Sequence, residues 1–237
     1  MDAALKAAAV ICAAGSSSRM GGIKKEYQKL PCGDTVLGSS VRAFAAVPSV
    51  KIIVIAVPEG GEAETHKTLP PAILSAGKPD ILFVTGGSTR CASVYNALSS
   101  LTEFNPDYVL IHDGARPWVS VSLIENIIAA VKKYNAVIPA LLLTETPKEF
   151  ETPLKSAAGE TPAVFIKNHL KRINTGIAQT PQGFKFAEIL KAHEKAAGVT
   201  GEEFTDDAEI WGRFCGKVAV IPGEAGNKKI TFPEDLT

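Results

Sequence analysis

Apolar runs alternate with polar, glycine-containing loops along most of this 237-residue chain. Short runs with few or no charged residues are typical of buried parallel strands, and we predict such strands at 7–13, 50–57, 81–85, 108–112 and 136–143. Helices are predicted between these strands, at 35–46, 62–76, 88 onward and 122–134. Asp34 is the predicted N-cap of the first of these helices, and Ser88 is the predicted N-cap of the third. This order predicts an α/β fold with a mainly parallel sheet and helices on both faces.

Three polar loops follow predicted strands, at 14–27, 86–93 and 113–117. In open parallel sheets the carboxyl ends of the strands share one edge, and ligands bind beyond that edge. We therefore expect these three loops to converge on one binding site.

The first of these loops has the composition of an anion-binding loop. Gly15 and the serines after it carry little side chain, so main-chain N–H groups can approach a phosphate closely, and Arg19, Lys24 and Lys25 supply positive charge. The loop lacks both the Gly-x-Gly-x-x-Gly pattern of dinucleotide-binding proteins and the Gly-Lys-Ser/Thr ending of the Walker loop. The sequence therefore predicts a phosphate site of another class, with an ordinary strand-to-helix turn as the alternative for this loop alone.

Between 144 and about 172 the alternation of strands and helices stops. Prolines at 147, 153 and 162, together with mixed charge, do not suit a buried crossover helix. We predict an extended arm here, inserted into a single domain that covers 1–237, and we expect the arm to pack on a second subunit. After the arm, helices are predicted at 183–197 and 206–214, and short strands at 217–221 and 229–231.

Charge and cysteine content limit the partners and the compartment. Lysine plus arginine and aspartate plus glutamate both number 25, so no overall basic field favours nucleic acid or an anionic membrane as a partner. Cys12, Cys32, Cys91 and Cys215 lack the spacing of a metal site, which is typical of free thiols in a reducing compartment. We see neither a secretory leader nor an apolar run of about 18 residues, so the sequence predicts a cytoplasmic protein.

Asp113 is the carboxylate best placed for chemistry. It closes an apolar strand beside two candidate phosphate loops, where it is either a Mg²⁺ ligand or a turn residue. His112 is predicted to pack in the interior, whereas His66 and His193 are predicted at exposed helix positions without a role. Because no Ser-His-Asp or Cys-His set stands out, we expect chemistry by positioning and charge stabilisation, as in phosphoryl or nucleotidyl transfer.

Seven motifs occur in the order found in 2-C-methyl-D-erythritol 4-phosphate cytidylyltransferases and span nearly the whole chain. They are the loop 15–27, GGSTRCASV at 86–94, DGARP at 113–117, ETPK at 145–148, Arg172 with QTPQGF at 179–184, TDD at 205–207 and NKKITFPEDL at 227–236. The chain therefore resembles this family. The resemblance implies a Rossmann-like, three-layer nucleotidyltransferase fold and a homodimer formed through the arm.

The resemblance also implies a reaction in non-mevalonate isoprenoid synthesis. CTP and 2-C-methyl-D-erythritol 4-phosphate would give the CDP-methylerythritol and pyrophosphate, with Mg²⁺ as cofactor. Three basic residues would hold the triphosphate and stabilise the transition state: Arg19, Lys25 and Lys229. The nucleotide would be bound by Ala13, Ala14, Gly15, Gly86, Gly87, Ser93 and Asp113, with Asp113 also the metal ligand. The polyol phosphate would be bound by Thr146 and Arg172 of the neighbouring subunit's arm, with Thr180 and Thr205 nearby.

The chain departs from the family pattern in its first loop and near its end. Where the family has Pro-Lys-Gln-Tyr, this chain has Lys24-Lys25-Glu26-Tyr27, which leaves the choice of catalytic lysine open. Where many members have Asp, Gly226 stands, which removes a potential second metal carboxylate. Two alternatives remain open: a ribitol phosphate cytidylyltransferase, and a CTP-binding homologue without activity.

Overall fold

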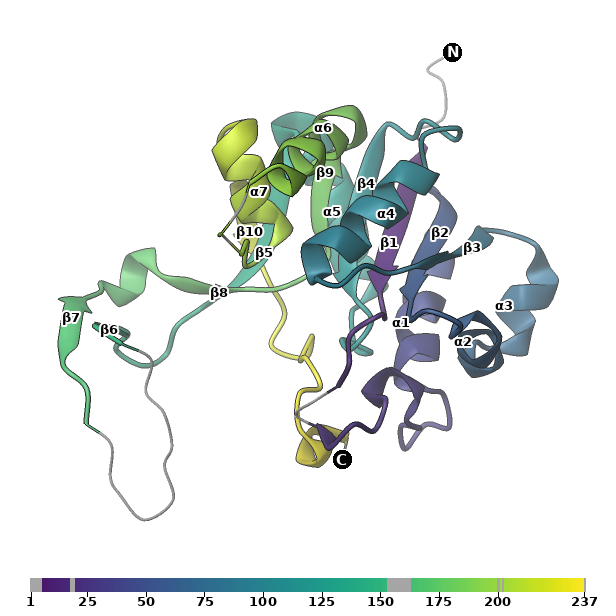
Figure 1. Cartoon of the computed structure of the whole chain (residues 1–237), viewed down its shortest axis with the longest axis horizontal. Helices are drawn as coiled ribbons and strands as arrows, with labels where there is room; N and C mark the ends of the chain where they lie inside the picture. The colour runs from purple at the N-terminus through teal and green to yellow at the C-terminus, as the bar shows by residue number, and fades with distance from the viewer. Residues whose placement is uncertain (1–5, 18–19, 153–162, 200, 202, 237) are drawn as a thin grey trace.

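The computed structural model describes residues 6–17, 20–152, 163–199, 201 and 203–236, and its body is a sheet between two layers of helices (Figure 1). The described strands of the sheet lie in the order β10-β5-β9-β4-β1-β2-β3, with β8 paired to the end of β5. Their bounds are β1 (Ala7–Cys12), β2 (Val50–Val57), β3 (Asp80–Thr85), β4 (Tyr108–Asp113), β5 (Ala136–Leu142), β8 (Gly176–Ala178), β9 (Gln182–Lys185) and β10 (Ala219–Pro222).

The pairing confirms the predicted, mainly parallel sheet. Parallel ladders join β1 to β2 and β4, β2 to β3, and β5 to β10. In contrast, β9 runs antiparallel to both β4 and β5. The carboxyl ends of β1, β3 and β4 therefore share one edge, as the three-loop prediction requires.

Helices cover both faces of this sheet. Their bounds are α1 (Val36–Ala45), α2 (Glu62–Thr68), α3 (Pro71–Ala76), α4 (Arg90–Ser100), α5 (Val121–Tyr134), α6 (Phe186–Ala197) and α7 (Asp207–Phe214), with short 3₁₀ turns η2 (Lys25–Tyr27), η3 (Arg172–Asn174) and η4 (Pro233–Leu236). None of the described helices combines the length and apolar character that crossing a membrane requires.

Alternate residues of the central strand β1 face opposite layers. Ala9 and Ile11 belong to a core shared with α1 and α5, whereas Ala8 and Val10 belong to a core shared with α4, α6 and α7. Because both faces of the strand are covered, every position is apolar, and the sequence shows a continuous apolar run instead of an alternating one.

Two helix caps differ from the predicted ones by one residue. Thr35, not Asp34, caps α1, since its hydroxyl accepts from the N–H three residues on at 2.9 Å. Thr89, not Ser88, caps α4 in the same way at 3.1 Å. In both places two adjacent residues can act as caps, and only the path of the backbone selects one.

Four other predicted elements are corrected by the structure. The predicted helix 62–76 is split into α2 and α3 at Pro70 and Pro71, which cannot continue a helix. The predicted helix 183–197 begins only at Phe186, because the residues before it form β9 between β4 and β5. Residues 229–231 form no strand; instead the N–H of Ile230 donates to Ala115 O at 2.9 Å. The predicted strand 217–221 is observed as β10, at Ala219–Pro222.

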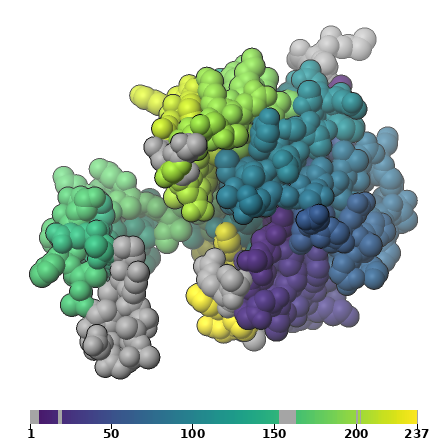
Figure 2. Space-filling model, viewed as in Figure 1, coloured from purple at the N-terminus to yellow at the C-terminus, as the bar shows by residue number. Residues whose placement is uncertain are grey.

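The arm stands apart from the body of the molecule (Figure 1; Figure 2). Its described part pairs β6 (Lys148–Phe150) antiparallel with β7 (Ile166–His169), and β8 then leads the chain back to β5. The extended conformation agrees with the prediction from the prolines. Pro153 and Pro162 lie outside the described residues.

Candidate active site

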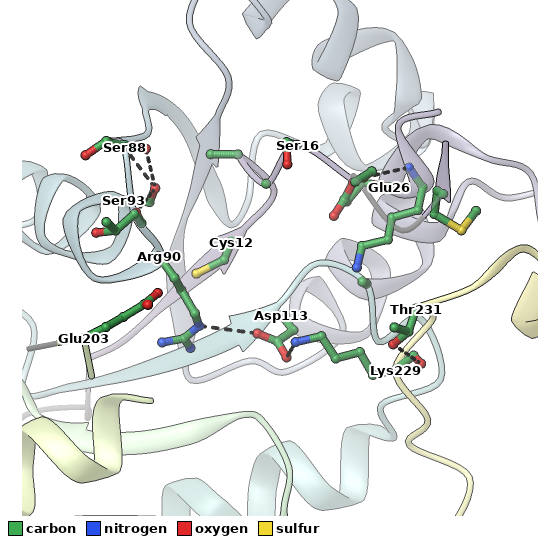
Figure 3. A pocket seen from close by; sticks show the side chains of 18 residues that line it. Cys12, Ser16, Glu26, Ser88, Arg90, Ser93, Asp113, Glu203, Lys229 and Thr231 are labelled. Atoms are coloured by element: carbon green, nitrogen blue, oxygen red, sulfur yellow. Dashed lines mark hydrogen bonds and ion pairs between the residues drawn. The ribbon is translucent and has the colours of Figure 1, made fainter. Parts of the chain in front are cut away.

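A cavity of about 610 Å³ opens beyond the carboxyl edge of the sheet (Figure 3). All three predicted loops contribute to it, so the prediction that they converge is confirmed. A volume of this size lies in the range typical of small-molecule sites. The lining residues are Cys12, Ala14, Gly15, Ser16, Ser17, Met20, Lys25, Glu26, Gly87, Ser88, Thr89, Arg90, Ser93, Asp113, Ala115, Glu203, Lys229 and Thr231.

One wall is formed by the first and second loops. Gly86 has no room for a side chain, because a Cβ there would overlap Ala14 Cβ and Ser93 Oγ. Ser93 Oγ accepts from the Gly87 N–H at 3.0 Å and donates to Thr89 O at 2.8 Å, which fixes the second loop on the start of α4. The two loops are therefore in close contact, and because Ala14, Gly15 and Gly87 carry little or no side chain, main-chain groups contribute to this wall of the cavity.

Another part of the cavity holds Asp113 among three basic side chains. Its Oδ2 lies 2.7 Å from Lys229 Nζ and 3.5 Å from Arg116 Nε. Its Oδ1 lies 3.7 Å from Arg90 Nε, so the carboxylate sits between Arg90 and Lys229 (Figure 3). Burial opposes ionisation, but the charges of Lys229 and Arg90 hold the pKa of Asp113 well below its usual range. Asp113 is therefore an anion at neutral pH that orders the cations around it.

Thr180 holds Asp113 from the interior. Its Oγ1 accepts from the Asp113 N–H at 3.0 Å and lies 3.0 Å from His112 Nδ1. Burial lowers the pKa of His112 to about 4, so the ring is neutral at pH 7. The ring Nε2 lies 3.2 Å from Arg116 O and carries the proton, which leaves Nδ1 to accept from the Thr180 hydroxyl. His112 packs in the interior as predicted, and Thr180 is buried with it.

Arg90 is anchored by a buried pair that the sequence reasoning missed. Its Nη2 lies 2.7 Å from Asp207 Oδ2, and His193 Nε2 lies 3.2 Å from Asp207 Oδ1. Burial disfavours the charged form of Asp207, but the Arg90 charge and the hydrogen bond from His193 lower the pKa of Asp207 to about 2. Burial alone would lower the pKa of His193, but the hydrogen bond to Asp207 raises it to about 9. The predicted exposed position of His193 is wrong, because its side of α6 is buried in the core beneath α4 and α7.

The raised pKa of His193 predicts a loss of stability at high pH. Such a group stabilises the fold fully below its unfolded pKa of about 6.5, and this contribution is lost as the pH rises through about 9. Between pH 6 and pH 10 we expect the free energy of unfolding to fall by about 3 kcal/mol more than in a His193→Gln variant. Urea unfolding at both pH values measures this; an equal fall in both proteins would show that folding does not raise the pKa of His193.

The structure distinguishes the two adjacent lysines of the first loop. Lys25 lines the cavity, and its Nζ donates to Ile230 O at 3.1 Å. Lys24 is not among the lining residues; its Nζ donates to Ala13 O and Gly15 O, at 2.6 Å each. The geometry therefore favours Lys25 as the lysine that meets a ligand.

The cavity gathers seven of the predicted site residues: Ala14, Gly15, Lys25, Gly87, Ser93, Asp113 and Lys229. Ala13 and Gly86 are adjacent to it, Ala13 fully buried and Gly86 against Ala14. Thr146 and Arg172 are on the exposed arm, and Thr205 lies before α7, where its hydroxyl donates to Glu209 at 2.7 Å. Arg19 lies outside the described residues.

Sequence reasoning gave no site role to several residues that line the cavity, among them Arg90, Thr231 and Glu203. Arg90 follows the glycines of the second loop directly, so its position in that motif was an available signal. Thr231 belongs to the motif that contains Lys229. Glu203 follows no motif, and no local pattern distinguishes it from other surface acids.

The cavity offers few ligands to a metal ion. In the part of the chain that the structure describes, no group of three or more His, Cys, Asp or Glu side chains could hold one. Asp113 could supply one ligand, and Mg²⁺ commonly takes only one or two carboxylates, with water and phosphate oxygens completing its shell. The residues present therefore fit Mg²⁺ bound together with a phosphate ligand.

Comparison with protein families gives one match over nearly the whole chain. The model described as 2-C-methyl-D-erythritol 4-phosphate cytidylyltransferase matches residues 7–237. Among curated proteins, the bifunctional enzyme IspD/IspF of Rhodospirillum rubrum is 40% identical over 238 residues, covering 98% of this chain and 55% of that protein. The bifunctional enzyme IspD/IspF of Brucella anthropi is 37% identical, with coverage of 98% and 54%. The chain thus spans about half the length of these relatives.

Two solved structures share the fold over nearly their full length. The 4-diphosphocytidyl-2C-methyl-D-erythritol synthase of Anaerococcus prevotii superimposes with a TM-score of 0.81 at 28% identity, covering 98% of this chain and 93% of that chain. The 2-C-methyl-D-erythritol 4-phosphate cytidylyltransferase of Thermus thermophilus superimposes with a TM-score of 0.73 at 30% identity, covering 98% and 96%.

Proposed function

Because this chain belongs to the 2-C-methyl-D-erythritol 4-phosphate cytidylyltransferase family, we propose that it transfers the cytidylyl group of CTP to 2-C-methyl-D-erythritol 4-phosphate. One observation carries the proposal: a single cavity combines a wall of residues with little or no side chain, from the first two loops, with basic side chains around Asp113. This wall suits cytosine and ribose, and the basic side chains suit the triphosphate.

In the proposed reaction a phosphate oxygen of the polyol phosphate attacks the α-phosphorus of CTP in line. The new O–P bond forms as the bond to the bridging oxygen breaks, and pyrophosphate leaves with that electron pair. The phosphate monoester is already ionised near neutral pH, so no general base is needed. Lys25 and Lys229, which line the cavity, would stabilise the charge that develops on the phosphate oxygens. We assign the same role to Arg19.

We propose that Mg²⁺ enters with the triphosphate. The described lining carries three cations, Lys25, Arg90 and Lys229, against three acids, Glu26, Asp113 and Glu203, so it has no excess of positive charge for a polyanion. Asp113 and the phosphate oxygens would hold the ion, which neutralises phosphate charge when bound.

Chelation tests the metal. We expect EDTA to abolish pyrophosphate release from CTP and the polyol phosphate, and added Mg²⁺ to restore it, because the described lining leaves the phosphate charge unbalanced. Turnover at the full rate in EDTA would remove the metal from the proposal.

A substrate panel tests the reaction. Pyrophosphate release is measured with CTP and, in turn, 2-C-methyl-D-erythritol 4-phosphate and ribitol 5-phosphate. Turnover with the methylerythritol phosphate supports the proposal, and turnover with ribitol phosphate alone would replace the substrate. Stabilisation of the fold by CTP without pyrophosphate release from either substrate would identify a nucleotide-binding homologue without activity.

We further propose a homodimer in which the arm completes the polyol phosphate subsite of its neighbour. Thr146 and Arg172 lie on the arm and do not line the cavity of their own chain. Large apolar side chains of the arm and its base are exposed in the single chain, to 79% at Leu142, 80% at Phe165 and 84% at Ile173. Apolar side chains exposed together in this way are typical of an interaction surface, and a second copy would cover them.

Ile173→Asp tests the homodimer. A charge at this exposed apolar position should weaken association, because the carboxylate would lose water in the interface. We expect light scattering to show a monomer, with kcat/KM for the polyol phosphate reduced at least tenfold. Phe104→Asp, on the body and 43% exposed, is the matched control and should leave both unchanged. A fully active monomer would exclude a role of the arm in the neighbouring site.

We place the activity in the cytoplasm. All four cysteines are described and none is in a disulfide, as is typical of a reducing compartment.

A further inference from the structure

Lys24 is bonded to the backbone of the loop that precedes it. Its Nζ donates to Ala13 O and to Gly15 O, at 2.6 Å each, across eleven and nine residues of chain respectively. These two carbonyls flank Ala14, which lines the cavity, and Gly15 lines it as well. One ammonium group therefore ties down both ends of the segment that forms part of the cavity wall.

The surroundings of Lys24 are built for a cation. Its side chain is only 17% exposed, and Glu26 Oε2 lies 3.8 Å from the ammonium. The same Glu26 oxygen accepts from Ser17 Oγ at 3.3 Å, so the acid connects the lysine to another part of the loop. The Tyr27 ring lies 5.8 Å from Nζ at its centroid, within reach of a cation–π contact. These contacts hold the Lys24 ammonium against the protein and away from the cavity lining. Lys25 also bonds to the protein, through Ile230 O, but its side chain lines the cavity.

We propose that Lys24 is a positioning residue that preorganises the nucleotide-binding loop through its two carbonyl hydrogen bonds, and thereby sets the affinity for CTP. Carbonyl oxygens repel phosphate oxygens, so binding two of them to an ammonium lowers that repulsion at the edge of the cavity. Fixing both carbonyls also removes backbone freedom that binding would otherwise have to remove. The inference rests on the proposed function, because it assigns CTP as the ligand of this loop.

The division of work between adjacent lysines gives a distinct kinetic signature. A residue that orders the loop equally for bound CTP and for the transition state changes KM and leaves kcat nearly unchanged. A residue that stabilises charge only in the transition state changes kcat. Lys24 should therefore act on KM for CTP, whereas Lys25 should act on kcat.

Lys24→Met and Lys24→Arg test this proposal. Methionine keeps most of the side-chain volume and loses both donors, whereas arginine keeps donors for two carbonyls. For Lys24→Met we expect the CTP dissociation constant from calorimetry and KM for CTP to rise at least tenfold, with kcat within about threefold of the parent protein. Lys24→Arg should recover most of the affinity.

Lys51→Met is the matched control. Lys51 also donates to a main-chain carbonyl, Pro48 O at 2.6 Å, but it lies at the start of β2 and does not line the cavity. The Lys51→Met protein should have the same CTP dissociation constant as the parent protein. Unchanged CTP affinity in Lys24→Met would overturn the inference, and so would a collapse of kcat at unchanged affinity.

Two further outcomes are separated by the same experiments. If Lys24→Met does not fold, the arginine variant decides. A folded Lys24→Arg protein whose CTP dissociation constant is at least tenfold above that of the parent protein contradicts the two-carbonyl role. If the parent protein itself binds no CTP, both the proposed function and the inference are wrong. If the parent protein and Lys24→Met bind CTP with equal affinity, only the inference is wrong.

Discussion

Lys25→Met is expected to lower kcat for pyrophosphate release by about 100- to 1,000-fold, with little change in the free energy of unfolding. Lys25 lines the cavity from η2, next to the loop that we assign to the nucleotide. Its charge would be used mainly as negative charge builds on the phosphate oxygens, so the loss should appear in kcat more than in KM for CTP. Single-turnover mixing of enzyme, CTP and polyol phosphate measures the chemical step directly.

Lys29→Met is the control for this experiment. Lys29 is four residues further along the same segment, is exposed, and does not line the cavity. Its replacement should leave kcat within twofold of the parent protein. If Lys25→Met retained full kcat, the charge at the α-phosphorus would have to come from other residues, and the assignment of Lys25 would be wrong.

Asp207→Asn is expected to destabilise the fold by about 3–5 kcal/mol, because it leaves the charges of Arg90 and His193 without their shared anion. The side chains of Asp207 and His193 are fully buried, so water cannot replace the lost carboxylate. Arg90 should also lose its fixed position beside Asp113, which lowers kcat/KM. Urea unfolding measures the stability, and the pyrophosphate assay measures the activity.

A surface pair provides the comparison. Asp34 accepts two hydrogen bonds from Arg42, at 2.7 and 2.8 Å, a geometry at least as good as that of Asp207 with Arg90. The Arg42 side chain is 51% exposed, so Asp34→Asn should cost about 1 kcal/mol or less. Equal losses in the two variants would show that burial does not set the strength of the Asp207 pair.

Local patterns predicted most of the sheet and the place of the site. The apolar runs located β1 to β5, since strands covered on both faces have few polar positions, and the loops after β1, β3 and β4 do share a cavity. β9 was not predicted, because Gly183 and its neighbours have no distinct strand pattern. Their pairing with β4 and β5 depends on residues more than forty positions away.

By itself the sequence determined the fold class, the family resemblance and the loops that carry the chemistry, because each of these is written in short runs of neighbouring residues. Only the tertiary structure decided what each charged side chain faces. It turned Lys24 toward its own backbone and Lys25 toward the cavity, although the two are adjacent. It also buried His193 against Asp207, fourteen residues along the chain. The physical reason is that desolvation and charge pairing depend on which distant elements pack together, which adjacent residues do not reveal.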